Sequence, residues 1–372
     1  MGLAQNTKSV SHDYLHKIKE SFEECHWIIA VDDAAIKETR GMSLVRRPDL
    51  DAAKGWGMLL VVLGHAAPPE WATTLIYGFH MPLFFVISGI LWNGSVRPGG
   101  VLRRLMVPFY WGSVATWFVW VAKVLFMKPD GVPLWGPLLA TVYGGNLFGY
   151  LVHNGALWFL PALFALYVTL WLLMYATSSR AALVGSMTTL GVVMLLVSPD
   201  VPALRTLPLS LGQGLVGGLF FVVGWLGRST LRERSIVRPL SPWHVIAFAL
   251  GSAVLILTER FNGRVDLLSM QFGQPALYLL DGLLGSTLMV GLCRLPCMQW
   301  SLIRMIGANT LQVLVFHQPL MWVLRFVFST MNVESNCLLL TGLTLSLFLL
   351  VFNLLEWHVR YLVARTSLNI KS

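Results

Sequence analysis

Four side chains that could take part in chemistry lie in otherwise apolar segments: Lys54, His65, His80 and His317. Lys54 and His65 belong to the stretch "DAAKGWGMLLVVLGHAA" and are eleven residues apart. That spacing is close to three whole helical turns, so both project from one face, about 16 Å apart along the axis. Asp51 shares this face. Ionisable residues within apolar spans are costly and usually face a cavity or a polar partner, so each of these is a candidate functional residue.

The histidine of this stretch is the strongest catalytic candidate, because imidazole is the side chain best suited to accept a proton near neutral pH. Counting 1.5 Å per residue from each predicted membrane boundary places His65 near mid-bilayer, His80 about 12 Å deep and His317 about 14 Å deep. The three imidazoles could therefore line one cavity. The alternative for each is an interhelical hydrogen bond that only fixes packing. We predict a catalytic His65, with His80 and His317 in supporting or acceptor-binding positions.

Composition indicates the elements that hold these residues. The chain of 372 residues is 56% hydrophobic and only 12% charged, whereas globular domains carry about a quarter charged residues. The sequence therefore predicts an all-α, polytopic membrane protein. Runs long enough for a bilayer core number about ten, with no soluble domain between them. The predicted spans are 52–68, 72–93, 105–126, 156–176, 181–198, 208–227, 243–258, 275–292, 308–328 and 337–356.

The formal charge of +9 is explained by where the basic residues lie. Lys and Arg concentrate in cytoplasmic loops of membrane proteins, and one alternating set of loops here carries most of them. The opposite loops have only Lys128, Arg205, Arg260 and Arg264. We therefore predict that both termini are cytoplasmic, that the protein is a multi-pass protein of the cell membrane, and that it has no nucleic-acid partner.

Three regions follow from this pattern: a polar N-terminal extension over 1–48, a transmembrane domain over 49–358 and a cytoplasmic tail over 359–372. The extension is explained either by a misassigned start, since Met42 lies just before the first span, or by a regulatory helix. The long outer connection, 127–155, is rich in Gly, Pro and aromatic residues. It is either a lid or acceptor-binding loop, or an inert segment packed into the membrane mouth.

The four cysteines are scattered and form no recognisable ligand pattern, so we predict neither a structural disulfide nor a metal site. They are Cys25, Cys293, Cys297 and Cys337.

Five segments in a fixed order resemble a known family: "RRPDLDAAKGWGMLLVVLGHA", "GFHMPLFFVISGILW", "RRLMVPFYW", "ALWFLPALF" and "GANTLQVLVFHQPL". This arrangement resembles the integral-membrane acyltransferase 3 family, particularly its fucose 4-O-acetylase-like branch. The family's basic residue, ten intervening positions and histidine fall on Lys54 and His65, with lysine in place of arginine. Its second motif, two arginines separated by two residues, is not matched, because the chain has adjacent Arg103 and Arg104 and a glycine at Gly100.

The resemblance implies transfer of an acyl group, usually acetyl from acetyl-CoA, to a hydroxyl of a carbohydrate or glycan, within a domain of roughly ten helices. Acetyl-CoA is then a co-substrate, with no permanently bound cofactor and with membrane lipid as the surroundings. Its phosphates call for basic groups at a cytoplasmic mouth. The candidates are Lys54, Arg97, Arg103 and Arg104, although the topology alone would also place arginines there.

In this reading His65 acts as general base or carries the acetyl group as a transient acyl-imidazole. Asp281, in "YLLDGLLGSTL", is either a group that orients a histidine or binds a sugar hydroxyl, or a hydrated residue near the outer interface. The main rival is a proton-coupled glycan or lipid transporter, which intramembrane histidines would also suit. Against it, no inverted repeat is visible in the sequence.

Overall fold

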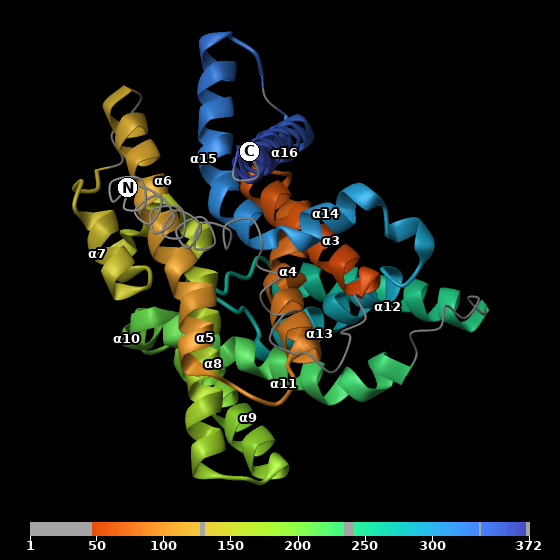
Figure 1. Cartoon of the computed structure of the whole chain (residues 1–372). Coiled ribbons are helices and arrows are strands. Elements are labelled where there is room, and N and C mark those ends of the chain that lie inside the picture. Colours follow the sequence, from red (N-terminus) through yellow and green to blue (C-terminus); the bar gives the residue numbers. More distant parts are fainter. Residues whose placement is uncertain (1–46, 127–130, 234–241, 335, 370–372) are drawn as a thin grey trace, which may run out of the picture. The chain divides into compact units, whose positions relative to one another are not determined.

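The computed structural model describes residues 47–126, 131–233, 242–334 and 336–369, and none of these residues forms a strand. The predicted N-terminal extension therefore lies almost wholly outside the described residues. The all-α prediction is confirmed. The helices (Figure 1) are α3 (Pro48–His65), α4 (Glu70–Leu91), α5 (Pro98–Val101), η1 (Leu102–Met106), α6 (Val107–Phe126), α7 (Gly136–Tyr143), η2 (Leu147–Gly149), η3 (Leu151–His153), η4 (Gly155–Trp158), α8 (Phe159–Ala176), α9 (Arg180–Val197), α10 (Pro202–Arg205), η5 (Pro208–Ser210), α11 (Leu211–Glu233), α12 (Pro242–Asn262), α13 (Pro275–Leu292), η6 (Pro296–Met298), α14 (Ser301–Ala308), α15 (Thr310–Thr330) and α16 (Cys337–Asn369).

Nine helices within the described part of the chain are long and apolar enough to cross a membrane. The protein is therefore a multi-pass membrane protein. The predicted span missing from these nine is the first one, which corresponds to α3. This helix has 18 residues, and its first turns carry Asp49, Asp51 and Lys54. It also ends at His65, earlier than the predicted residue 68, because left-handed Ala67 (φ 58°) and two prolines follow.

Among the described residues, 47–350 form one compact unit, and residues from 351 onward belong to a second. The last helix, α16, starts in the first unit and continues through the second to Asn369. The predicted C-terminal tail therefore begins as a continuation of this helix.

Helix α3 packs against α14 (Figure 1), and the two backbones come very close to each other. A Cβ atom at Gly55 would overlap the carbonyl oxygen of Ile303, and a Cβ atom at Gly307 would overlap the carbonyl oxygen of Asp51. Small residues allow this close approach between membrane helices. The contact fixes the position of the half of α3 that carries Lys54.

Helix α4 runs back along α3 and also packs on α11 and α13. Gly57 faces Leu83, and Gly64 faces Tyr77, where an added Cβ atom would lie 3.2 Å from the Tyr77 ring. These pairs show that α3 and α4 are antiparallel. We refer to the end at which α3 begins and α4 finishes as the Lys54 end, and to the opposite end as the His65 end.

Candidate active site

The ring of His65 lies against two neighbouring residues of α15. The centroids of the His65 and His317 rings are 5.3 Å apart. The side-chain amide nitrogen of Gln318 lies 3.3 Å from His65 Nδ1 and 3.4 Å from His65 Nε2. His65 is partly accessible, whereas His317 is only 1% exposed. The structure thus places the His65 ring against two polar side chains of α15.

The two buried histidines, His80 and His317, are held in the same way. Nδ1 of His80 donates to the carbonyl oxygen of Ile76 at 2.7 Å, and Nδ1 of His317 donates to that of Val313 at 2.9 Å. Because a carbonyl oxygen can only accept, Nδ1 carries the proton and Nε2 is left with a lone pair. Nε2 of His317 has no hydrogen-bond partner among the described residues. It can therefore accept a proton donor that enters the site.

A proline follows each of these histidines by two positions, Pro82 in α4 and Pro319 in α15. An interior proline has no N–H, so the carbonyl four residues earlier loses its helical partner. In α15 this carbonyl belongs to Val315, and the side-chain amide of Asn154 donates to it at 2.7 Å. Asn154 is fully buried. The long connection before α8 is thus attached to α15 beside His317.

The same connection approaches Gln318. An added Cβ atom at Gly155 would lie 3.9 Å from the Gln318 amide nitrogen. The neighbouring His153 is fully buried, with no hydrogen-bond partner for either ring nitrogen among the described residues. Burial lowers the pKa of His153 to about 4. The outer connection predicted from the sequence is therefore partly buried against the His65 site.

Helix α4 supplies the other side of the site. Tyr77 packs on Gly64, next to His65, and its ring meets that of His80 edge to face at 5.0 Å. The guanidinium of Arg264 lies over the Tyr77 ring, 5.0 Å from its centroid. His80 is close enough to His65 for an electrostatic interaction between them. The three histidines singled out in the sequence therefore gather at the His65 end.

Arg325 is a site residue that the sequence analysis missed. Its Nη2 atom donates to the backbone carbonyl oxygen of His65 at 2.9 Å. Gln318 and Arg325 are seven residues apart, close to two helical turns, and so share one face of α15. The signal was present in the sequence, because an arginine inside the predicted span 308–328 is itself an intramembrane charge.

The predicted basic residues lie in two groups. Lys54 forms an ion pair of 2.9 Å with Asp51 in α3. Arg97, Arg103 and Arg104 are all exposed; Arg97 precedes α5, whereas Arg103 and Arg104 lie in the π-helical turn η1. Such turns are frequent at functional sites.

Two further arginines, Arg180 and Arg228, contact tryptophan residues. Arg180 stacks over the Trp225 ring, 4.7 Å from its centroid, and Arg228 donates to the carbonyl of Trp92. The rings of Trp92 and Trp225 are themselves in contact, with centroids 4.7 Å apart. The structure therefore places Arg180 against an indole ring and Arg228 against the backbone of a tryptophan.

Asp281 is fully buried, and its Oδ1 atom accepts a hydrogen bond from the hydroxyl of Thr258. Neither oxygen bonds to a histidine among the described residues. Its acidic neighbour is Glu259, 3% exposed, whose carboxyl group lies against Gly78 of α4. Asp281 therefore belongs to a buried pair of carboxyl groups between α12, α13 and α4. It is not a hydrated interfacial residue, and the sequence analysis missed Glu259.

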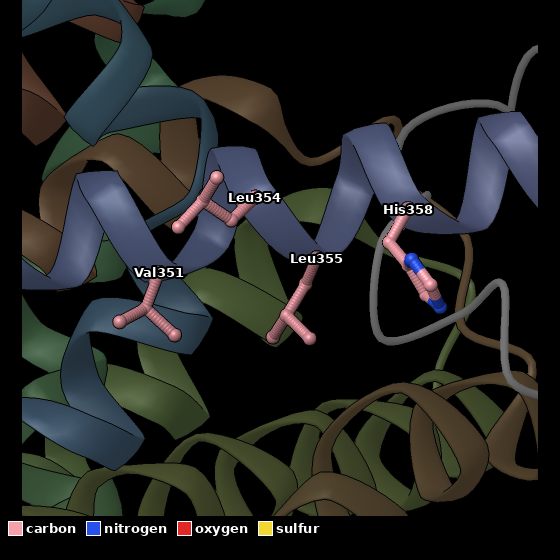
Figure 2. A pocket seen from close by; sticks show the side chains of 4 residues that line it. All are labelled: Val351, Leu354, Leu355 and His358. Atoms are coloured by element: carbon pink, nitrogen blue, oxygen red, sulfur yellow. The ribbon is translucent and has the colours of Figure 1, made fainter.

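A separate concavity lies on α16, within the unit that contains residue 351 onward. It is lined by Val351, Leu354, Leu355 and His358, and three of these project to the same side of the helix (Figure 2). Its lining is hydrocarbon with one imidazole. None of the site residues predicted from the sequence lies in it.

A family model for an acyltransferase domain matches residues 47–355, which is most of the chain. The chain belongs to the acyltransferase 3 family. The resemblance inferred from the motifs is confirmed at this level, while the fucose 4-O-acetylase-like branch stays a prediction. Searches of the curated proteins and of the solved structures gave no match. Membership makes this acyltransferase 3 protein an acyltransferase, and the matched region includes all the site residues described above.

Proposed function

We propose that this acyltransferase transfers an acetyl group from acetyl-CoA to a hydroxyl of a carbohydrate or glycan acceptor, with His65 as the catalytic residue. The observation that carries the proposal is the arrangement of His65 itself. Its ring lies against His317 and Gln318 in a member of an acyltransferase family. A base whose ring is held by polar neighbours is what proton removal from an incoming hydroxyl requires.

In the direct mechanism, His65 takes the proton of the acceptor hydroxyl while that oxygen attacks the thioester carbonyl carbon. The carbon–sulfur bond then breaks, and the proton passes from His65 to the thiolate, which leaves as the CoA thiol. In the two-step mechanism, an unprotonated ring nitrogen of His65 attacks the thioester carbonyl carbon, the carbon–sulfur bond breaks and CoA leaves as the thiolate. The hydroxyl then attacks the acyl-imidazole, the carbon–nitrogen bond breaks, and the hydroxyl proton neutralises the thiolate. Both mechanisms give the same ester and thiol, and both use the amide of Gln318 to hold the ring.

The donor would enter from the Lys54 end, which we assign to the cytoplasmic side, with both termini on that side and the protein in the cell membrane. Lys54 and the exposed Arg97, Arg103 and Arg104 would bind the phosphates of acetyl-CoA. The acceptor would lie at the His65 end, beside His80 and His317. Asp281 is not included, because its buried carboxyl group accepts a hydrogen bond from the Thr258 hydroxyl.

The test is acetyl transfer by the purified protein in lipid nanodiscs, with radiolabelled acetyl-CoA and a panel of glycan acceptors. A general base contributes about 10²- to 10⁴-fold to rate, so His65→Ala should lower transfer by that factor in folded protein. His358→Ala, which changes an exposed histidine on α16, is the matched control and should keep the wild-type rate.

Two outcomes would contradict this proposal. Wild-type transfer by His65→Ala would remove His65 from the mechanism. Absence of transfer by wild type to every acceptor, together with uptake of a glycan or lipid into vesicles, would favour the transporter. Label trapped on the protein before acceptor is added, and lost in His65→Ala, would select the acyl-imidazole route.

A further inference from the structure

Arg325 places a positive charge next to His65, the residue that we propose to be catalytic. Its guanidinium bonds to the His65 backbone carbonyl, and its charge acts on the His65 ring. The side chain is only partly exposed. Gln318, two turns earlier on the same face of α15, contacts the ring of the same histidine. Two polar side chains of one helix are therefore directed at one residue of another.

No carboxylate of the described residues neutralises this charge. The two ion pairs among the described residues join Arg47 to Asp49 and Lys54 to Asp51. A partly buried cation without a counter-ion is costly within a membrane domain. The cost is more readily understood if a negative charge arises beside the guanidinium during the reaction.

Termination of α3 alone does not require an arginine. His65 is the last residue of α3, so its carbonyl lacks a helical partner and accepts from any suitable donor. A neutral amide would serve for that single bond. The guanidinium has five N–H groups in a planar fork, and its one hydrogen bond to the His65 carbonyl leaves others for a ligand.

We propose that Arg325 is a second catalytic residue, which binds the oxyanion of the tetrahedral intermediate. When the acceptor oxygen adds to the thioester carbonyl, the π electrons move to the carbonyl oxygen and give it a full negative charge. The free N–H groups of Arg325 donate to this oxygen. The charge returns to re-form the carbonyl as the carbon–sulfur bond breaks, and His65 delivers its proton to the thiolate. This inference rests on the proposed function.

The experiment compares steady-state kinetics of Arg325→Gln, Arg325→Lys and wild type in nanodiscs. Glutamine keeps a donor for the His65 carbonyl and removes the charge, whereas lysine keeps the charge. Loss of one oxyanion donor costs about 10²- to 10³-fold in kcat. Arg325→Gln should therefore lose kcat by that factor with KM for acetyl-CoA unchanged, and Arg325→Lys should retain more activity than Arg325→Gln. Arg260→Gln, at an exposed arginine of α12, is the matched control.

Wild-type kcat in Arg325→Gln would overturn the inference, and so would equal losses in the glutamine and lysine variants. If Arg325→Gln does not fold, Arg325→Lys decides alone, because full loss of kcat in folded lysine protein would show that the charge is not what matters. Failure of the proposed function is seen separately, as absence of acetyl transfer by wild type. Activity in wild type with no effect of Arg325→Gln leaves the proposed function standing and removes only this inference.

Discussion

The hydrogen bond from Asn154 to Val315 makes a specific prediction about stability. Pro319 deprives the Val315 carbonyl of its helical donor, and the buried Asn154 amide replaces that donor at 2.7 Å. Asn154→Ala should therefore leave a buried carbonyl without a partner. In a Pro319→Ala background the backbone N–H at position 319 returns, so the same substitution should cost much less.

The size of the effect follows from the burial. A buried acceptor that loses its donor costs about 1–3 kcal/mol. The other side-chain atom of Asn154, Oδ1, has no partner among the described residues, so its removal relieves part of this cost. We therefore expect a loss of about 2 kcal/mol in the natural background and under about 1 kcal/mol beside Pro319→Ala.

The assay is thermal unfolding of the four purified proteins, wild type, both single variants and the double variant, in one detergent. A loss of this size corresponds to a fall in Tm of roughly 3 °C for a chain of this length. The coupling between the two substitutions is the decisive quantity. An equal fall in Tm for Asn154→Ala in both backgrounds would show that the amide does not replace the missing N–H, and the reasoning would be wrong.

Two further predictions concern packing and pH. Gly307→Ala places a methyl group on the Asp51 carbonyl, so it should cost about 1–3 kcal/mol or more, whereas Gly185→Ala, with open space around it, should not; equal Tm values would contradict this. For His153, burial lowers the pKa to about 4 from 6.5. Between pH 6.5 and pH 4, His153 is protonated in the unfolded chain but neutral in the folded protein. The free energy of unfolding should therefore fall as pH drops below about 6.5, by about 2 kcal/mol at pH 5. In His153→Gln, Tm should therefore fall less between pH 6.5 and pH 5 than it does in wild type. The same pH dependence of Tm in both proteins would contradict this role of His153.

Much of the fold could be predicted from the sequence, because apolar runs of this length satisfy their backbone groups in a membrane only as helices. The exception is informative. The first span was placed by hydropathy, which extended it beyond His65, although the "AAPPE" that follows contains the prolines that end it. Because α3 begins with polar residues, including Asp51 and Lys54, its apolar stretch is shorter than those of the other spans.

The candidate site could be predicted only in part. His65, His80 and His317 stood out because a titratable group within an apolar run is rare. Gln318 did not stand out, since its importance depends on α15 lying beside α3. The donor for the Val315 carbonyl is 161 residues away in the chain, so no local pattern could have identified it. Glu259 was missed because it lies at the predicted end of its span, where a carboxylate is expected to meet water.

The length of α3 bears on which acyl donors the protein can use. The helix is continuous from Lys54 to His65, which fixes a separation of about 16 Å along the axis. A donor whose charged head group lies at Lys54 and whose acyl group lies at His65 has to be extended over that whole distance. A small activated acid such as an acyl phosphate is far too short to reach both residues. The length of α3 would therefore select for an acyl donor in which a long, narrow linker separates the acyl group from the charged head group.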